Sequence, residues 1–319
     1  GGAGYIGSHV CHLLIDNGFK ITCIDSLITG NKKLLPKEVR LEILDVSEKE
    51  KVSNLIKSNN FDLVMHFAGL IRVDESIKQP ERYRDFNFLK AKSFLETCYE
   101  NNLKKIIFSS TAAVYGDAKN NRVTEEDPVN PLNPYASSKL ELENFIKKTS
   151  TKYNSKYVIL RYFNVAGASN SGKIGEIGNR NDRLIKNLAI QFFKDKAKIN
   201  IHGTNYKTKD GTCIRDYIHV SDIADIHKMC VDYLNKNFKS NTFNCGYEKG
   251  YSVLEISKIF KKLKKNTIIK FGKRRSGDVG QVFANSSKFK KIFKWKPKYN
   301  DIKKILNSSI KWEKKLNHL

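Results

Sequence analysis

The stretch from Asn133 to Lys139 sets a phenol and an ammonium four residues apart, at Tyr135 and Lys139, where a helix should begin. Side chains at that spacing share one face of a helix. A free tyrosine has a pKa of about 10, so a tyrosine base near neutral pH needs a pKa lower by roughly three units, or about 4 kcal/mol. A neighbouring positive charge can supply much of that change. The pair therefore predicts proton transfer by Tyr135, with Lys139 as its charge partner.

Two other Tyr…Lys pairs have the same spacing, so the surroundings must decide among the three. Tyr115 and Lys119 are separated by a Gly-Asp dipeptide, which breaks the helix that this pair would need. Tyr299, whose partner is Lys303, follows a proline near the end of the chain. The setting favours Tyr135.

A run of hydroxyl residues closes the apolar stretch before this helix. Ligands of open α/β sheets bind outside the carboxyl ends of the strands, so Ser109 should face a cofactor and Thr111 should reach a substrate. Thr111 would then align a substrate hydroxyl while Tyr135 takes its proton. Lys139 would lower the pKa of the phenol and hold a bound cofactor.

Glycines at the start of the chain have the spacing of a phosphate-binding loop. Gly1, Gly4 and Gly7 stand three residues apart, and a helical stretch follows, with Tyr5 and Ile6 at its start. Such a turn lets the backbone approach a pyrophosphate, which then lies at the helix N-terminus. The loop normally follows a buried strand, so we expect a strand before Gly1 that the sequence does not include.

Asp25 strengthens this interpretation, because it lies 18 residues after Gly7 at the end of a predicted strand. A carboxylate there can accept hydrogen bonds from an adenosine ribose. The same carboxylate would repel a ribose 2′-phosphate, and the neighbouring Ser26 and Leu27 supply no compensating arginine. The motif predicts binding of NAD, with Ser26 beside the adenosine ribose and Lys139 holding the nicotinamide ribose, and disfavours NADP.

Apolar, β-branched runs alternate with helical stretches along the first half of the chain. The predicted strands cover residues 20–25, 62–68, 104–110 and 157–162, and the longest predicted helices cover 80–101 and 134–153. This alternation predicts an α/β fold with a doubly wound parallel sheet of the Rossmann type. We expect residues 1–163 to form the NAD-binding domain, with 213–236 packing back onto it, and 164–319 to form a smaller α/β substrate domain.

Composition excludes several other classes of protein. The 319 residues are 40% hydrophobic, and no apolar run approaches the roughly 18 residues of a membrane span. Six scattered cysteines without a C-x-x-C pair read as reduced thiols of a cytoplasmic protein with no metal site. The net charge is +25, but 47 of the 58 basic residues are lysines spread over nearly every segment. We therefore expect no nucleic-acid partner, although this charge would attract an anionic substrate.

Several segments together resemble the UDP-glucose 4-epimerases, a family of extended short-chain dehydrogenases/reductases. They are residues 1–7, 67–69, 109–116, 134–139, 160–164 and 210–220. The resemblance implies oxidation of a UDP-hexose at C4, rotation of the 4-keto sugar, and return of the hydride to its other face. NAD is then a tightly bound cofactor that each turnover regenerates, and the enzyme serves galactose metabolism. The resemblance also implies a homodimer, with the helices at 86–101 and 134–153 as candidates for its interface.

The resemblance assigns further binding residues. Around NAD it places Asp45, Val46, Phe67, Ala68, Gly69, Asn87 and Phe163. Around UDP it places Asn164, Leu184, Arg215, Arg275 and Asp278. Arg215 and Arg275 can neutralise a diphosphate, and Asp278 can accept a hydrogen bond from a ribose hydroxyl.

Two positions separate this chain from better-known epimerases. Ile71 stands where they place a lysine that contacts NAD, and Arg72 is the nearest substitute. Val282 matches the position that faces the sugar and is bulky in glucose-only enzymes. A valine leaves room for an N-acetyl group, which predicts interconversion of UDP-N-acetylglucosamine and UDP-N-acetylgalactosamine as well; plain core packing is the other interpretation of Val282.

Other functions remain open at this point. A nucleotide-sugar 4,6-dehydratase needs an acid and a base beside Thr111, but Ala112 and Ala113 occupy those places. A UDP-sugar decarboxylase needs a group that binds a sugar carboxylate, and we identify none. A non-catalytic NAD-binding module would keep its function after Tyr135→Phe.

Overall fold

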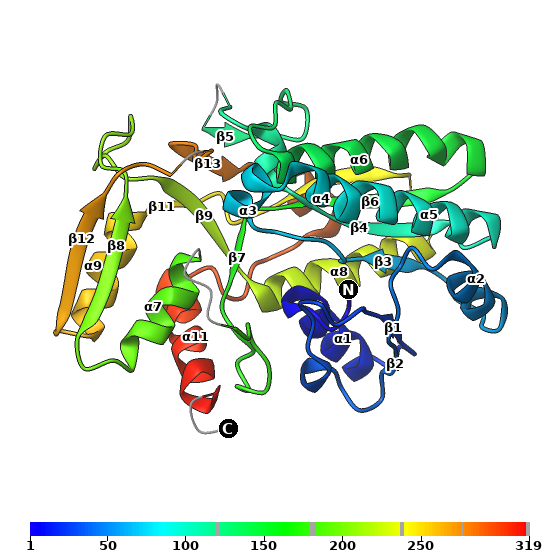
Figure 1. Cartoon of the computed structure of the whole chain (residues 1–319), viewed down its shortest axis with the longest axis horizontal. Helices are drawn as coiled ribbons and strands as arrows, with labels where there is room; N and C mark the ends of the chain where they lie inside the picture. Colours follow the sequence, from blue (N-terminus) through cyan, green and yellow to red (C-terminus); the bar gives the residue numbers. More distant parts are fainter. Residues whose placement is uncertain (119–120, 179–182, 237–238, 276, 317–319) are drawn as a thin grey trace. The chain divides into compact units, whose positions relative to one another are not determined.

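The computed structural model describes residues 1–118, 121–178, 183–236, 239–275 and 277–316 (Figure 1). The chain packs as two units. The first contains Gly1–Val114, Pro131–Tyr162 and Ala224–Phe243, and the second contains Tyr115–Asn130, Phe163–Ile223 and Asn244–Leu319. This division differs from the expected domain boundaries, because 115–130 groups with the second unit and the returning segment is Ala224–Phe243 in place of 213–236. Lys119 and parts of the expected domain 164–319 lie outside the described residues.

The first unit is built on a four-stranded sheet in the order β10-β6-β4-β3. These strands are β3 (Val64–His66), β4 (Lys105–Thr111), β6 (Lys156–Tyr162) and β10 (Asn241–Cys245). β3 runs parallel to β4, and β4 runs parallel to β6 with Ser110 opposite Arg161. A separate parallel pair is formed by β1 (Thr22–Ile24) and β2 (Arg40–Glu42). The predicted α/β fold with a parallel sheet is confirmed.

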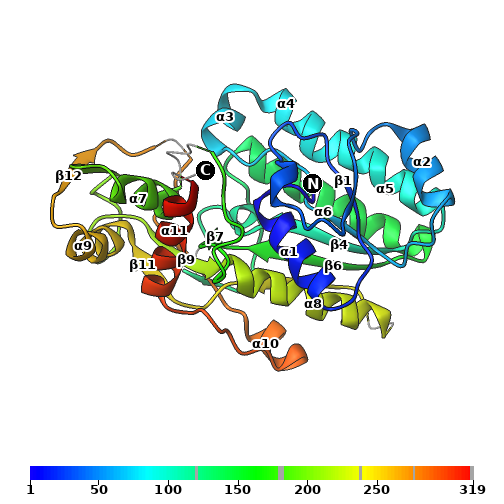
Figure 2. The ribbon, with the colours of Figure 1, turned by 90° about the horizontal axis from the view of Figure 1, so that it is seen from below.

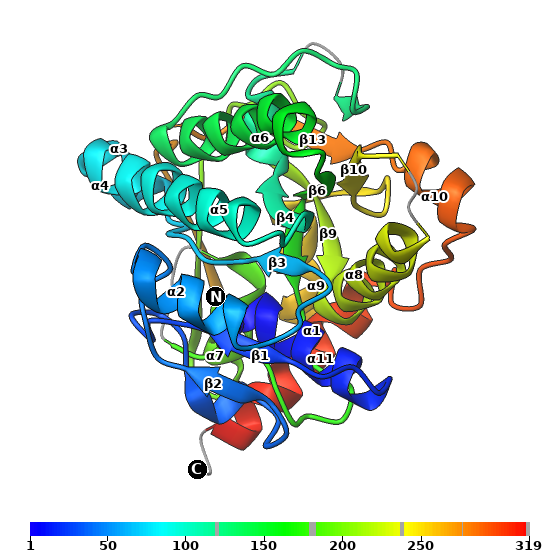
Figure 3. The same ribbon diagram turned by 90° about the vertical axis from the view of Figure 1, so that its right-hand side faces the viewer.

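Helices cover both faces of this sheet (Figure 3). On one face α6 (Pro134–Tyr153) contacts β6 through Arg161, and on the other face α8 (Val220–Asn235) contacts β6 through Tyr162. Successive side chains of a strand point to opposite faces, so these two adjacent contacts show a doubly wound arrangement. α1 (Tyr5–Asp16) lies beside α8 (Figure 2).

The predicted helix at 80–101 is interrupted. It consists of α4 (Pro80–Arg84), a π-helical segment η2 (Asp85–Leu89) and α5 (Lys90–Glu100). A π-helical turn contains more residues than an α-helical one, so it changes the direction of the side chains within it. The turn buries Asn87, which is 1% exposed. The remaining helices of this part are η1 (Lys32–Leu34), α2 (Lys49–Lys57), α3 (Val73–Lys78) and η3 (Ala112–Tyr115).

The second unit contains a sheet in the order β11-β9-β13-β5, with β7 also paired to β9, and a parallel pair β8–β12. Its strands are β5 (Arg122–Val123), β7 (Asn164–Ala166), β8 (Ala197–His202), β9 (Ile214–His219), β11 (Gly250–Ser252), β12 (Thr267–Gly272) and β13 (Gln281–Ala284). Its helices are α7 (Leu184–Phe192), α9 (Val253–Leu263), α10 (Ser287–Phe293) and α11 (Ile302–Leu316). Across the described parts of the chain, no helix combines the length and apolar character needed to cross a membrane. All six cysteines are buried free thiols.

Candidate active site

The end of β4 and the start of α6 carry the three predicted catalytic residues. Asn133 caps α6 by accepting the Ala136 N–H at 2.9 Å, so the helix begins where the sequence predicts. Tyr135 is therefore in the first turn and Lys139 lies one turn later. Lys139 Nζ donates to the carbonyl oxygen of Ser109 at 3.0 Å. This bond ties the helix to the strand that ends at Thr111.

Lys139 lies in an apolar environment. The residue is 4% exposed, and its Nζ lies 5.1 Å from the centre of the Phe108 ring. Burial lowers the pKa of its ammonium group from 10.5 to about 8. A charge held in such a low-dielectric place acts strongly on a neighbouring phenol. The position suits a residue that lowers the pKa of Tyr135.

Asn87 links the loop after β3 to α6. Its Oδ1 accepts the Leu70 N–H at 2.7 Å, and its Nδ2 donates to the Leu70 carbonyl at 3.0 Å and to Ser138 Oγ at 3.2 Å. Gly69 has a φ of 155°, and a Cβ there would lie 2.9 Å from Asn87 Oδ1 and 3.4 Å from Lys139 Nζ. The site thus needs glycine at position 69.

The glycine loop packs tightly against neighbouring backbone within the first unit. A Cβ on Gly1 would lie 2.3 Å from the Ala68 nitrogen, and one on Gly7 would lie 2.6 Å from the Gly1 carbonyl oxygen. A Cβ on Gly4 would lie 3.4 Å from the Gly1 oxygen, which is ordinary contact. The fold therefore demands Gly1 and Gly7 but not Gly4. At Gly4 the missing side chain leaves the N-terminus of α1, with Tyr5 and Ile6, open to a phosphate.

The Asp25 carboxylate is oriented by the same loop. Its Oδ2 accepts the Ala3 N–H at 2.9 Å, and its Oδ1 accepts the Leu27 N–H at 2.8 Å. Asp25 is buried, whereas the adjoining Ser26 is exposed. Each carboxylate oxygen keeps a second lone pair for a ribose hydroxyl. The phosphate cradle and this carboxylate together fit a dinucleotide.

Asp45 is held by a residue that the sequence did not indicate. Its Oδ2 accepts from Lys90 Nζ at 2.8 Å, and its Oδ1 accepts from the N–H and hydroxyl of Ser47. Partial burial would raise the pKa of Asp45, but the hydrogen bonds from Lys90 and Ser47 outweigh it and lower the pKa. Val46 packs against the apolar core of this unit.

Phe67 lies beyond the end of β3, in a cluster of rings. Its ring centre is 5.0 Å from that of His227. The preceding His66 is buried between the rings of Phe94 and Phe108. Burial, and then the charge of Lys139, hold the pKa of His66 well below its usual value. This histidine therefore stays neutral at physiological pH.

In the second unit, β9, β13 and the turn before β13 bring two predicted UDP-binding residues, Arg215 and Asp278, close to the predicted sugar-facing residue Val282. Arg215 Nη2 donates to the Val279 carbonyl at 2.7 Å and lies 4.0 Å from Asp278 Oδ1. Val282 is the register partner of Arg215 in the β9–β13 pair, and its side chain is buried. The guanidinium and the small apolar side chain thus share one strand pair, and the carboxylate lies in the turn that leads into it.

The other residues predicted to contact the cofactor or UDP in this unit are more dispersed. Asn164 is exposed at the start of β7, where it pairs with Tyr217 of β9, and Arg275 is exposed beyond β12. Leu184 begins α7, where its partly buried side chain packs against the apolar core. Phe163 is buried and its N–H donates to the Cys245 carbonyl at 3.2 Å.

Arg72 does not take over the role of the NAD-contacting lysine that Ile71 replaces. Its Nη2 donates to Asp74 Oδ2 at 2.7 Å, and both side chains are about half exposed. The Arg72 N–H donates to the hydroxyl of Tyr83 at 2.9 Å. The guanidinium is therefore already paired with Asp74, in the first turn of α3.

The tyrosines of the two competing pairs make other contacts. Tyr115 ends the short helix η3, and its hydroxyl donates to Asn244 Oδ1 at 2.7 Å. Tyr299 precedes α11 and stacks on the ring of His219 at 4.5 Å. The setting around Tyr135 is distinct from both.

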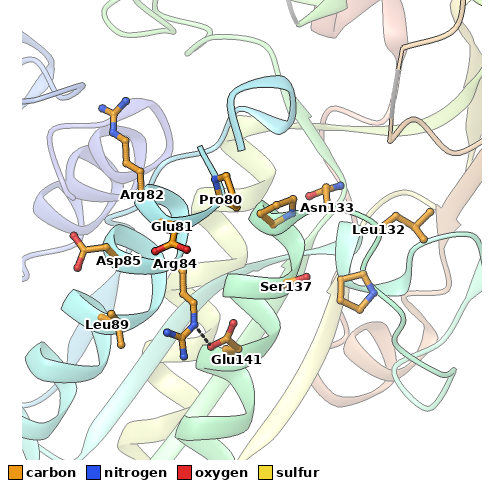
Figure 4. A pocket seen from close by; sticks show the side chains of 12 residues that line it. Pro80, Glu81, Arg82, Arg84, Asp85, Leu89, Leu132, Asn133, Ser137 and Glu141 are labelled. Atoms are coloured by element: carbon orange, nitrogen blue, oxygen red, sulfur yellow. Dashed lines mark hydrogen bonds and ion pairs between the residues drawn. The ribbon is translucent and has the colours of Figure 1, made fainter. Parts of the chain in front are cut away.

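A groove of about 760 Å³ runs along α4 and the start of α6 (Figure 4). Arg84 Nε donates to Glu141 Oε2 at 3.1 Å across it. Its lining includes none of the residues expected to bind NAD or the sugar. The groove is therefore a feature separate from the candidate active site.

Comparison with known proteins identifies the family of this chain. The model of the NAD dependent epimerase/dehydratase family matches residues 1–246, and the chain belongs to that family. A UDP-glucose 4-epimerase of Lactobacillus helveticus is 38% identical over 315 residues, covering 98% of this chain and 96% of that protein. The chain is an NAD-dependent epimerase.

Solved structures agree over the whole fold. The UDP-glucose 4-epimerase from Bifidobacterium longum, in complex with NAD+ and UDP, is 34% identical with a TM-score of 0.91, covering 98% of this chain and 96% of that one. The UDP-Glc/GlcNAc 4-epimerase from Campylobacter jejuni is 38% identical with a TM-score of 0.85, covering 99% and 98%. The cofactor of the present enzyme is NAD.

Proposed function

We propose that this epimerase interconverts UDP-glucose and UDP-galactose by inverting C4 of the sugar. The observation that carries the proposal is the buried Lys139 ammonium, which is fixed to the strand that ends at Thr111. When bound, NAD accepts a hydride from C4 and returns it. The protein must therefore move one proton, hold the sugar nucleotide and exclude water.

Tyr135 takes the proton of the C4 hydroxyl and later gives it back. Lys139 keeps the phenol acidic enough for this role and contacts the nicotinamide ribose. Thr111 accepts or donates a hydrogen bond at the same hydroxyl and aligns it. Ala112 and Ala113 follow Thr111 and offer no acid or base, which disfavours a dehydratase.

The second unit supplies the residues that bind UDP. Arg215 and Arg275 neutralise the diphosphate, and Asp278 accepts from a ribose hydroxyl. Anchoring through the nucleotide lets the 4-keto sugar turn without leaving the enzyme. The remaining contacts of the nucleotide come from Asn164 and Leu184.

We also propose that the enzyme accepts N-acetylated sugars. Val282 lies opposite Arg215 and is small, and the relative from Campylobacter jejuni is named a UDP-Glc/GlcNAc 4-epimerase. Val282→Tyr should abolish turnover of UDP-N-acetylgalactosamine while UDP-galactose is still converted. Equal loss of both activities would contradict this role of Val282.

The decisive experiment incubates the enzyme with UDP-galactose and UDP-N-acetylgalactosamine separately, without added NAD, and identifies the product sugars. We expect the C4 epimer in each case, because the cofactor stays bound. The Tyr135→Phe variant should retain NAD and lose turnover, which separates an enzyme from a non-catalytic NAD-binding module. Folded, NAD-containing enzyme that makes no epimer from either sugar would refute the proposal.

We propose further that the enzyme is a cytoplasmic homodimer, with a second copy seated on the groove along α4 and α6. The groove carries both signs of charge, at Arg82, Arg84 and Glu141, beside the exposed Leu89. A surface with both signs can pair with its own copy about a two-fold axis. Leu89→Asp should lower the mass measured by sedimentation, whereas Leu263→Asp, an exposed leucine on α9, should not.

A further inference from the structure

A buried network of charged side chains lies one helical turn beyond Lys139. Glu143 of α6 is 0% exposed, and its Oε1 accepts from Ser110 Oγ at 2.5 Å and from Arg161 Nε at 3.0 Å. Its Oε2 accepts from Arg161 Nη2 at 2.7 Å and from Lys147 Nζ at 3.3 Å. Both carboxylate oxygens are thus saturated by charged and hydroxyl donors.

The network joins three elements at one level of the sheet. Ser110 of β4 and Arg161 of β6 are register partners, so both side chains stand on the face covered by α6. Ser110 lies between Ser109, whose carbonyl accepts from Lys139, and Thr111. The C-terminal end of β4 is therefore bonded to α6 twice, by Lys139 and by Glu143.

We propose that Glu143, held by Arg161 and Ser110, is a positioning residue that sets the register of α6 against β4. In this role it keeps Tyr135 and Lys139 at the correct distance from the hydroxyl that Thr111 aligns. The inference rests on the proposed function and extends it to a group that touches neither NAD nor substrate.

Apolar packing alone already attaches α6 to the sheet, through the fully buried Leu142 and Ile146. The hydrophobic effect behind such contacts is non-directional. The Arg161–Glu143 pair is bidentate and directional. Replacing a buried ion pair by apolar residues of similar size is often neutral or stabilising. Stability alone therefore does not account for the ion pair. Its directional geometry does, because a misplacement of the reacting groups by about 1 Å can lower the rate by on the order of 10².

The first test is Ser110→Ala, which removes one bond to Glu143 and leaves the ion pair intact. We expect kcat to fall about tenfold, with KM for UDP-galactose and the content of bound NAD unchanged. The acidic limb of the kcat–pH profile should move to higher pH, because Lys139 then acts on Tyr135 from a less favourable position. Ser150→Ala is the matched control, since its hydroxyl donates only locally, to the Lys147 carbonyl of the same helix.

The second test replaces both charges, in the double variant Glu143→Met with Arg161→Met. We expect a folded protein of near wild-type thermal stability whose kcat is lower by about 10². A folded double variant with wild-type kcat and pH profile would overturn the inference, as would an unchanged profile in Ser110→Ala. If wild-type enzyme makes no epimer, the proposed function fails instead, so the two failures are distinguishable.

Discussion

The polar groups on the buried face of α6 and those around β9 and β13 are held in opposite ways. Lys139 and Glu143 are almost completely buried and bonded to neighbouring strands. Arg275 and Asp278 are exposed, and Arg215 relies mainly on backbone carbonyls. Around α6 the protein itself supplies the hydrogen-bond partners of the charged groups. Around β9 and β13, exposed charges can still pair with a ligand.

This difference matches two kinds of chemical work. Proton transfer requires fixed donor and acceptor atoms, and a buried network provides that rigidity before substrate arrives. A nucleotide brings its own charges, so it can itself complete the contacts of the exposed Arg275 and of the partly buried Arg215. Changes near α6 should therefore lower kcat, and changes near β9 should raise KM.

Tyr135→Phe should have the largest effect. Removing the phenol hydroxyl removes the acid and base, and we expect kcat to fall by about 10³ or more. KM for UDP-galactose and bound NAD should stay near wild-type values, measured by steady-state kinetics and by cofactor release on denaturation. A large rise in KM with little change in kcat would contradict the contrast between the two regions.

Lys139→Met should follow, with kcat lower by about 10² at pH 7, because the phenol pKa returns toward 10. In the wild type the ammonium is lost as pH rises through about 8, so activity should decline above that pH. In the variant, activity should instead increase up to about pH 10. The measurement is kcat against pH for both proteins.

The same substitution should stabilise the fold at neutral pH. The amine has a lower pKa folded than unfolded, so the wild type gains stability as pH rises from about 8 to 10.5 and carries the full burial cost below that range. That cost is about 3 kcal/mol. The variant gains less than this in stability, because it also loses the hydrogen bond to the Ser109 carbonyl. The measurement is the free energy of unfolding of both proteins in denaturant at pH 7 and at pH 10. We expect the two values to differ less at pH 10.

Arg215→Met should raise KM for UDP-galactose by about 10- to 100-fold with a small change in kcat, because hydrogen bonds to charged groups contribute about 1.5–3 kcal/mol. The matched control is Arg122→Met, which removes another arginine of the second unit that pairs with Glu248. A comparable KM in both variants would show that the charge of Arg215 does not grip the diphosphate.

Lys90→Met should have the smallest effect. The Lys90–Asp45 pair is about a quarter exposed, and pairs of that kind contribute up to about 1 kcal/mol. We expect NAD retention to weaken by no more than about fivefold. Because the pKa of Asp45 would rise, the loss should be greatest as pH falls toward 4. Dilution followed by assay of retained cofactor tests this outcome.

Much of the fold could be predicted from local patterns. The bounds of α6 follow from the cap at Asn133, the proline at the first helical position and the residues after them, and the predicted range 134–153 is confirmed. The π-helical segment η2 could not be predicted, because it depends on the bonds that Asn87 makes to Leu70 and Ser138. Those partners are 17 and 51 residues away.

The candidate site divides in the same way. The spacing of Gly1, Gly4, Gly7 and Asp25 was readable because each belongs to one continuous motif. Lys90 and Glu143 were missed, since their partners lie on distant segments. A signal for Glu143 was present: it lies four residues after Lys139, and Arg161 interrupts an otherwise apolar strand.

The sequence by itself determined the alternation of strands and helices, the phosphate loop and the Tyr135–Lys139 spacing, because each depends on neighbours within a few turns of chain. Only the tertiary structure decided that Lys139 is buried against Ser109, that Asn87 ties two loops together, and that Glu143 meets Arg161. Burial and hydrogen bonding between distant segments set these properties, and no local pattern contains them.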